Sequence, residues 1–189
     1  MSGQKHLNGW FQDSKGTRGI DLDSLMWLIR LLRPRQWVKN VFVLAPLIFS
    51  GEFLHAESIE ASLLAFLVFC IASSATYIVN DLHDIEGDRR HPTKSKTRPL
   101  AAGKVTVTMA LGLLGVLLVL LVAAGFVAPR VVAVIAAYLL LNLAYSFVLK
   151  HQPVIDIFTI ALGFVLRVYA GAMAWRCRFR AGCSLRPCV

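Results

Sequence analysis

Long apolar stretches alternate with short polar segments along most of this chain. Four of these stretches carry few or no charges and approach the roughly 20 residues that an α-helix needs to cross a bilayer. They are residues 61–79, 105–129, 131–149 and 154–175. The break at Pro129-Arg130 is only two residues long, so the second and third stretches are predicted to form a tight helical hairpin.

The region before these stretches is more mixed. Residues 1–22 are polar and predict a flexible tail. Residues 24–32 predict a short amphipathic segment lying at the membrane interface. Residues 41–49, extended by their flanks, predict a further membrane helix that is interrupted at Pro46. The pattern therefore predicts an all-α, polytopic membrane helix bundle with about five transmembrane helices, all within residues 23–174.

Composition supports the membrane class. The chain has 189 residues, of which 57% are hydrophobic and only 16% charged, and these values exclude an ordinary soluble domain. The formal net charge is +9, but the basic residues lie beside apolar stretches, where they would face anionic headgroups rather than nucleic acid. The four cysteines form no C-x-x-C pair, which argues against a zinc site or a disulfide framework.

Loop charge predicts the orientation in the membrane. Residues 81–104 contain six Lys or Arg residues, whereas residues 51–58 contain none. The positive-inside rule therefore places the N-terminus, the 81–104 loop and the turn at Lys150 in the cytoplasm of a cell whose plasma (inner) membrane holds the chain.

The last residues depart from this pattern. Residues 175–189 are rich in Arg, Cys, Gly, Ser and Pro, and would follow the last helix onto the outer face, where positive charge is disfavoured. We expect this tail to be non-native or out of frame. The alternative is a genuine short extracellular tail.

Between the first two long stretches lies a block of acids followed by bases. Asp81, Asp84 and Asp88 fall at i, i+3 and i+7, so on one continuous helix they would share a face within about 60°. Carboxylates placed so closely attract a hard cation such as Mg²⁺, which also accepts water and substrate phosphates as ligands. The sequence predicts a metal site here, with a solvated loop helix as the alternative.

The acidic block Asn80-Asp81-x-x-Asp84-x-x-x-Asp88 resembles the first aspartate-rich motif of the UbiA superfamily of membrane prenyltransferases. Four further blocks are similar to its phosphoribosyltransferase branch, which acts on decaprenyl phosphate. They span residues 33–40, 91–103, 145–150 and 156–172. The resemblance implies a fold of nine transmembrane helices around a central cavity, of which this chain would hold about five, being truncated at its C-terminus.

The resemblance also implies a reaction and its residues. Phosphoribose would pass from 5-phosphoribosyl diphosphate to a polyprenyl phosphate at the cytoplasmic membrane face, with Mg²⁺ as cofactor, in the synthesis of a cell-envelope polysaccharide precursor. Asp81, Asp84 and Asp88 would be the catalytic, metal-holding residues. The substrate-binding candidates are Lys39, Asn80, Arg89, Arg90, Lys94, Arg98, Tyr145 and Lys150.

Alternatives remain open at this point. The basic residues after the acidic block are also explained as topology anchors, and Lys39 and Lys150 as side chains that snorkel to the interface. Transfer of a prenyl group to an aromatic acceptor, as in quinone synthesis, is a rival reaction. A further alternative is that the chain is an inactive truncated fragment. The oligomeric state cannot be read from the sequence.

Overall fold

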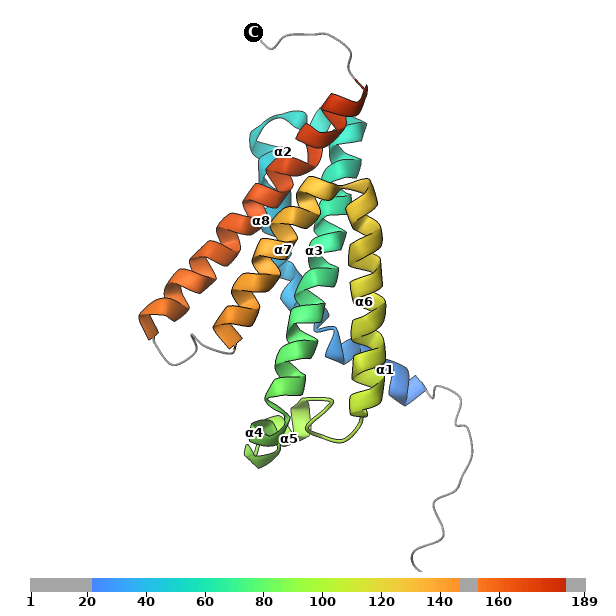
Figure 1. The fold of residues 1–189 in the computed structure, drawn as a ribbon, viewed down its shortest axis with the longest axis vertical. Coiled ribbons are helices and arrows are strands. Elements are labelled where there is room, and N and C mark those ends of the chain that lie inside the picture. Colours follow the sequence, from blue (N-terminus) through green and yellow to red (C-terminus); the bar gives the residue numbers. More distant parts are fainter. Residues whose placement is uncertain (1–21, 147–152, 183–189) are drawn as a thin grey trace, which may run out of the picture.

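A computed structural model describes residues 22–146 and 153–182, and every element in this part of the chain is a helix (Figure 1). Four long helices run alternately up and down, each beside the next in the sequence (Figure 1). They are α3 (Ala56–His83), α6 (Val107–Val127), α7 (Pro129–Ala144) and α8 (Pro153–Gly182). The short elements are α1 (Leu22–Leu31), η1 (Pro34–Leu44), α2 (Ala45–Phe49), η2 (Glu52–Leu54), α4 (Ile85–Arg90) and α5 (Lys94–Thr97).

The predicted membrane bundle is confirmed. Three helical segments are long and apolar enough to cross a bilayer, namely α3, α6 and Ile157–Ala174 within α8, and α7 is a shorter apolar helix. Outward-facing side chains of α6 are apolar and exposed, with Val119 at 68% and Phe126 at 87%. Such an apolar surface is costly in water and favourable against lipid chains.

The segment predicted to form the first membrane helix has a different secondary structure from the one expected. A helix over residues 41–49 interrupted at Pro46 was expected, but the segment already begins at Pro34 as the 3₁₀-helix η1, and Pro46 lies in the first turn of α2. A 3₁₀-helix rises about 2.0 Å per residue against 1.5 Å in an α-helix. The 11 residues of η1 and the 5 of α2 therefore extend over about 30 Å.

The 3₁₀ geometry explains which side chains of η1 are buried. With three residues per turn, positions i and i+3 lie in line. Trp37, Asn40 and Val43 form such a line against α3 and α8. Asn40 and Val43 have no exposed surface, and the indole nitrogen of Trp37 donates a hydrogen bond to Ser74 Oγ at 3.0 Å. Helix η1 is thus held against α3 and α8 by one line of side chains.

Close backbone approach fixes η1 against α8. A Cβ on Gly171 of α8 would lie 1.8 Å from the carbonyl oxygen of Val43, far inside van der Waals contact. Alanines on α3 similarly leave room for neighbouring helices, as with Ala65 and Ala72, which are buried. Small residues at such contacts let membrane helices pack by dispersion forces, because the hydrophobic effect gives little drive between helices in lipid.

Two apolar clusters meet at α3, which is the central helix. One lies between α3, α7 and α8 around Phe69 and Ile135, and the other lies between α1, α3 and α6 around Leu31 and Ile78. Because α1 packs into the second cluster, it is held against the end of the bundle that also carries α4 and α5 (Figure 1). We call this end the polar end.

Candidate active site

The acidic block spans a break between two helices. Helix α3 ends at His83, and Asp84 takes φ −94° and ψ 7° before α4 begins in a new direction at Ile85. Asp81 therefore belongs to the last turn of α3, whereas Asp88 belongs to α4. The expectation that three carboxylates share the face of one helix is wrong, because the break at Asp84 changes the helical phase.

Two of the three carboxylates are nevertheless brought together. The guanidinium Nη1 of Arg98 donates a short hydrogen bond to Asp88 Oδ2 and lies 3.2 Å from Asp81 Oδ1. Both aspartate side chains are buried, with 2% exposed surface for Asp81 and 5% for Asp88. A single arginine from the segment after α5 thus closes the loop back onto the end of α3.

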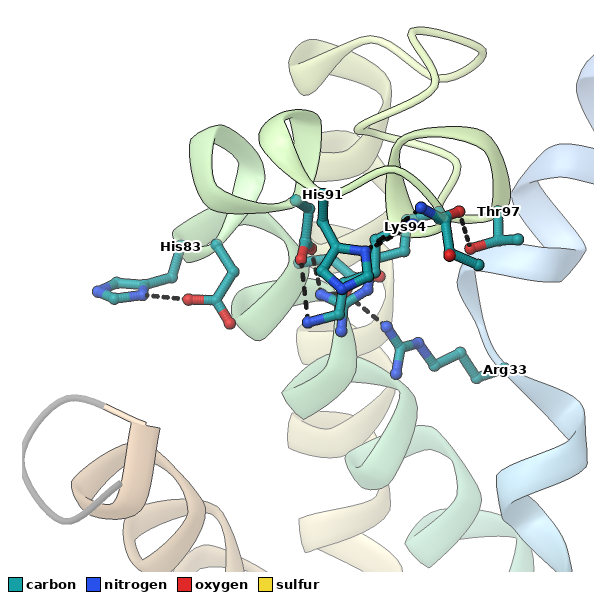
Figure 2. A network of polar contacts seen from close by, with 10 residues as sticks. Arg33, His83, His91, Lys94 and Thr97 are labelled. Carbon is teal, nitrogen blue, oxygen red and sulfur yellow. Dashed lines mark hydrogen bonds and ion pairs between the residues drawn. The ribbon is translucent and has the colours of Figure 1, made fainter. Parts of the chain in front are cut away.

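Two further cations complete the cluster. Arg33 Nη2 lies 2.6 Å from Asp81 Oδ1, and Lys94 Nζ lies 3.7 Å from Asp88 Oδ1. Figure 2 shows Arg33 reaching across from the α1–η1 side of the network. Arg33 sits at the turn before Pro34 with φ 52°, a left-handed conformation that is rare for a residue with a side chain. We call Arg33, Asp81, Asp88, Lys94 and Arg98 the ionic cluster.

Asp84 lies apart from the ionic cluster. Its side chain is 43% exposed, and Asp84 Oδ1 lies 3.1 Å from His83 Nδ1. His83 points away from Arg33 in Figure 2. Accordingly, within the residues that the structure describes, no group of three His, Cys, Asp or Glu side chains is arranged to hold a metal ion.

The two carboxylates that do come together nevertheless suit Mg²⁺ as ligands. This ion needs only one or two carboxylates, since water and substrate phosphates complete its octahedral shell. Asp81 Oδ2 is buried and has no hydrogen-bond partner in the described part of the chain. A buried carboxylate oxygen left unpaired is unfavourable unless a cation or donor reaches it. Asp81 and Asp88 are therefore the residues that suit a hard cation.

The ionic cluster has more positive than negative charge. Three cations face two carboxylates, and Arg89 and Arg90 add exposed positive charge on α4. Neither of these two arginines has a carboxylate within ion-pair distance in residues 22–146 and 153–182. The surplus suits phosphate, and an arginine has five N–H donors, so it can bind a carboxylate and a phosphate oxygen together.

A hydrogen bond ties the end of α3 to the end of α7. Ser146 Oγ donates to Asn80 Oδ1 in a short contact, and it also lies 2.9 Å from the Asn142 carbonyl oxygen. This bond orients the side chain of Asn80, the residue directly before Asp81 in the chain. It also places Tyr145, the neighbour of Ser146, at the level of Asn80. Ser146 was not singled out from the sequence, although it stands beside Tyr145 in a recognised block. Lys150 lies outside the described residues.

A second polar group lies inside the bundle, in the membrane-spanning part. Arg167 is 7% exposed; its Nε donates to Asn40 Oδ1 at 3.0 Å, and its Nη2 to the Tyr138 hydroxyl at 3.2 Å. The guanidinium also lies over the rings of Phe69, Phe164 and Tyr138, at 5.0 to 5.5 Å from their centroids. Cation–π contacts of this kind compensate part of the desolvation of a buried charge.

A small cavity adjoins this polar group. Its volume is about 140 Å³, and Lys39, Asn142, Tyr145 and Arg167 are among its lining residues. Lys39 and Arg167 bring two positive charges to this cavity, and none of its lining residues is acidic. In the sequence, Arg167 stands out as a charge within an apolar stretch, whereas its partners Asn40 and Tyr138 do not, because uncharged polar residues give no such signal. The side chain of Asp156, a second charge in the same apolar stretch, lies outside the described residues.

Comparison with known proteins gives consistent results. A profile of the UbiA prenyltransferase family matches residues 43–184. The chain is 42% identical over 168 residues to the decaprenyl-phosphate phosphoribosyltransferase of Mycolicibacterium smegmatis, an alignment covering 86% of this chain and 52% of the relative. It is 46% identical over 152 residues to the protein of that name from Corynebacterium glutamicum, covering 78% and 46%. For the Mycobacterium tuberculosis protein of that name, identity is 43% over 157 residues, covering 78% and 50%.

The chain therefore spans about half the length of the curated relatives it matches. The matched region contains α3 to α8, the acidic block and most of the ionic cluster. The resemblance read from the sequence motifs is confirmed, and this chain belongs to the UbiA prenyltransferase family.

Proposed function

We propose that this chain takes part in the transfer of phosphoribose from 5-phosphoribosyl diphosphate to a polyprenyl phosphate, with the ionic cluster as the diphosphate site. The observation that carries the proposal is the pair of buried carboxylates, Asp81 and Asp88, bridged by Arg98 at the polar end. The names of the relatives support the choice of donor and acceptor.

The ionic cluster suits a leaving diphosphate for two reasons. Asp81 and Asp88 would hold Mg²⁺, which when bound supplies positive charge to offset the charge developing on the departing oxygens. Arg33 and Arg98 are already held by these carboxylates, and each has further N–H groups that could bind a phosphate oxygen. A preorganised site stabilises the transition state without a further ordering cost.

The reaction needs no acid–base pair. A new bond forms between the anomeric carbon and an oxygen of the lipid phosphate, while the bond from that carbon to the diphosphate oxygen breaks and carries its electrons to the leaving group. The attacking phosphate oxygen is already ionised at neutral pH, so no side chain has to remove a proton. Asn80, fixed by Ser146, would orient a sugar hydroxyl or a carboxylate without adding charge.

The remaining candidate residues have supporting roles in this proposal. Arg89, Arg90 and Lys94 would bind phosphate oxygens from the exposed side of the ionic cluster. Lys39, at the cavity beside Arg167, would bind the lipid phosphate or the 5-phosphate of ribose. Asp84, Tyr145 and Lys150 are retained as site residues by their place in the family motifs. We also propose that the polar end faces the cytoplasm, on the charge of its loops.

A transfer assay tests the proposal. Membranes containing the chain are incubated with Mg²⁺, polyprenyl phosphate and radiolabelled 5-phosphoribosyl diphosphate, and label is counted in the organic phase. Asp81→Asn and Asp88→Asn should each reduce labelled lipid by about 10²-fold or more, as expected for loss of a group that supports transition-state charge. The matched control is Glu86→Gln, an exposed acidic residue of α4 outside the ionic cluster.

Three other outcomes would refute the proposal. Label transferred from a prenyl diphosphate to an aromatic acceptor, with none from the phosphoribosyl donor, would assign the rival reaction. No label with this chain, beside strong labelling by the Corynebacterium glutamicum relative under the same conditions, would mean that this chain alone is inactive. Normal labelling by both aspartate variants would remove the ionic cluster from the reaction.

A further inference from the structure

A large open groove lies at the polar end, away from the cavity beside Arg167. Its volume is about 1090 Å³, and it is bounded by α1, by the start of η1 and by the segment from Lys96 to Lys104. It shares no lining residue with the smaller cavity between η1, α3, α7 and α8. We call it the basic groove.

The basic groove concentrates positive charge. Its walls hold one carboxylate, that of Asp23, and six cations. The cations are Arg30, Arg33, Arg35, Lys96, Arg98 and Lys104. Arg33 and Arg98 belong to the ionic cluster, whereas the other four have no carboxylate within ion-pair distance in the part of the chain that the structure describes. Converging cations that repel one another and lack a partner indicate an anionic ligand.

One wall of the groove is apolar. Met26, Trp27 and Ile29 of α1 line it, and Met26 and Ile29 are 60% and 48% exposed. Leu22 and Leu25 continue the same exposed face of α1, because positions i, i+3, i+4 and i+7 lie on one side of a helix. Arg30 lies 4.8 Å from the centroid of the Trp27 ring, so the charged and apolar parts of the wall are in direct contact.

A ligand that matches both parts must carry an anionic group and an alkyl chain. The opposite face of α1 packs into the apolar cluster around Leu31 and Ile78. Helix α1 therefore has the character of an interfacial amphipathic helix, whose outer apolar face enters the headgroup region. The groove opens beside that face of α1, at the polar end. A soluble anion would not use the apolar wall.

We propose that the basic groove binds the phosphate headgroup of an anionic phospholipid from the leaflet at the polar end, with the first methylene groups of its chains against α1. This inference does not depend on the proposed transfer reaction. Because Arg33 lines the groove and also bonds Asp81, the bound headgroup would fix the α1–η1 turn next to the candidate active site.

The test counts lipid bound to the full chain in detergent by native mass spectrometry, with phosphatidylglycerol compared with phosphatidylcholine. The groove variant is the triple substitution Arg35→Gln, Lys96→Gln and Lys104→Gln, which leaves the ionic cluster intact. Each Lys or Arg near an anionic lipid surface contributes about a fivefold gain in binding, so its apparent Kd for phosphatidylglycerol should rise between about tenfold and hundredfold.

Two matched control variants are measured beside the groove variant. Arg89→Gln, Arg90→Gln and Arg130→Gln remove the same charge outside the groove, and should change that Kd by less than about twofold. Arg35→Lys, Lys96→Arg and Lys104→Arg keep the charge, and should keep the affinity. If circular dichroism shows that the groove variant loses helical content, its three single substitutions are measured instead. Each should raise the apparent Kd for phosphatidylglycerol by about fivefold.

Several results would overturn the proposal. Equal losses in the groove variant and in the charge-matched control would mean that binding follows net charge alone. Equal affinity for phosphatidylglycerol and phosphatidylcholine would remove the role of the anionic headgroup. Displacement of the lipid by millimolar inorganic phosphate or glycerol phosphate would identify a soluble phosphate as the ligand of the groove.

Discussion

Replacing Arg98 by Ala should destabilise the fold more than loss of either neighbouring cation of the ionic cluster. Arg98 is the only one of the three that contacts both buried carboxylates. Without it, Lys94 is the one cation left beside Asp88 among the described residues; its Nζ is 3.7 Å away and its side chain is 47% exposed. Breaking a buried ion pair by removing one partner costs about 3–5 kcal/mol, because a charge is left buried without compensation.

The expected magnitudes can be ordered. Arg98 is itself 24% exposed and Asp81 keeps Arg33, so we expect Arg98→Ala to cost about 3 kcal/mol, at the lower end of that range. Arg33→Ala removes one charge-assisted hydrogen bond of 2.6 Å and should cost about 1.5–3 kcal/mol. Lys94→Ala removes a partly exposed pair and should cost about 0–1 kcal/mol.

Unfolding of the purified chain in mixed micelles, followed by far-ultraviolet circular dichroism as sodium dodecyl sulfate is added, measures these differences. The decisive control is Asp88→Asn in the Arg98→Ala background. If an uncompensated carboxylate causes the loss, removing its charge should restore stability by about 1–2 kcal/mol, a coupling typical of residues in contact. Equal costs for Lys94→Ala and Arg98→Ala, or no recovery in the double variant, would refute the reasoning.

Three further outcomes are expected in the same unfolding assay. Gly171→Ala should lower stability by about 1–3 kcal/mol, because the added Cβ would overlap the Val43 carbonyl oxygen. Gly115→Ala in α6 should raise stability by up to about 1 kcal/mol, because no atom lies within 4 Å of its new Cβ. Arg167→Met should cost about 1–3 kcal/mol, since it leaves two buried acceptors without their donor; an unchanged midpoint would contradict this. Ser62→Ala should be neutral or stabilising by up to about 1 kcal/mol, because within the described residues the buried Ser62 hydroxyl has no partner; a clear loss would show a missed contact.

Apolar patterning predicted the long helices but not their ends. Residues 61–79 were expected to form a helix, and α3 runs from Ala56 to His83. The additional turns are polar, and a polar turn continues a helix at no cost where it reaches water or headgroups. Hydropathy therefore locates the part of a helix that lies in lipid, and it leaves the polar ends undetermined.

Local chemistry predicted the acidic block, whereas its geometry depended on distant contacts. No Pro or Gly marks the break at Asp84, so nothing in the sequence distinguishes a broken helix from a continuous one. Asp81 and Asp88 are joined by Arg98, which is 17 and 10 residues away. The hydrogen bond from Ser146 to Asn80 spans 66 residues. Pairings over such distances follow from packing, which periodicity within one segment does not describe.

The 3₁₀ geometry of η1 restricts how this segment can change length. Each residue advances the helix by about 120°, so deleting one residue would turn every later side chain away from α3 by a third of a turn. Asn40 would leave its bond to Arg167, and an exposed neighbour would take its place. Deleting or inserting three residues would keep the line of Trp37, Asn40 and Val43 and shift it by about 6 Å. The length of η1 can therefore change without loss of these contacts only in steps of whole turns.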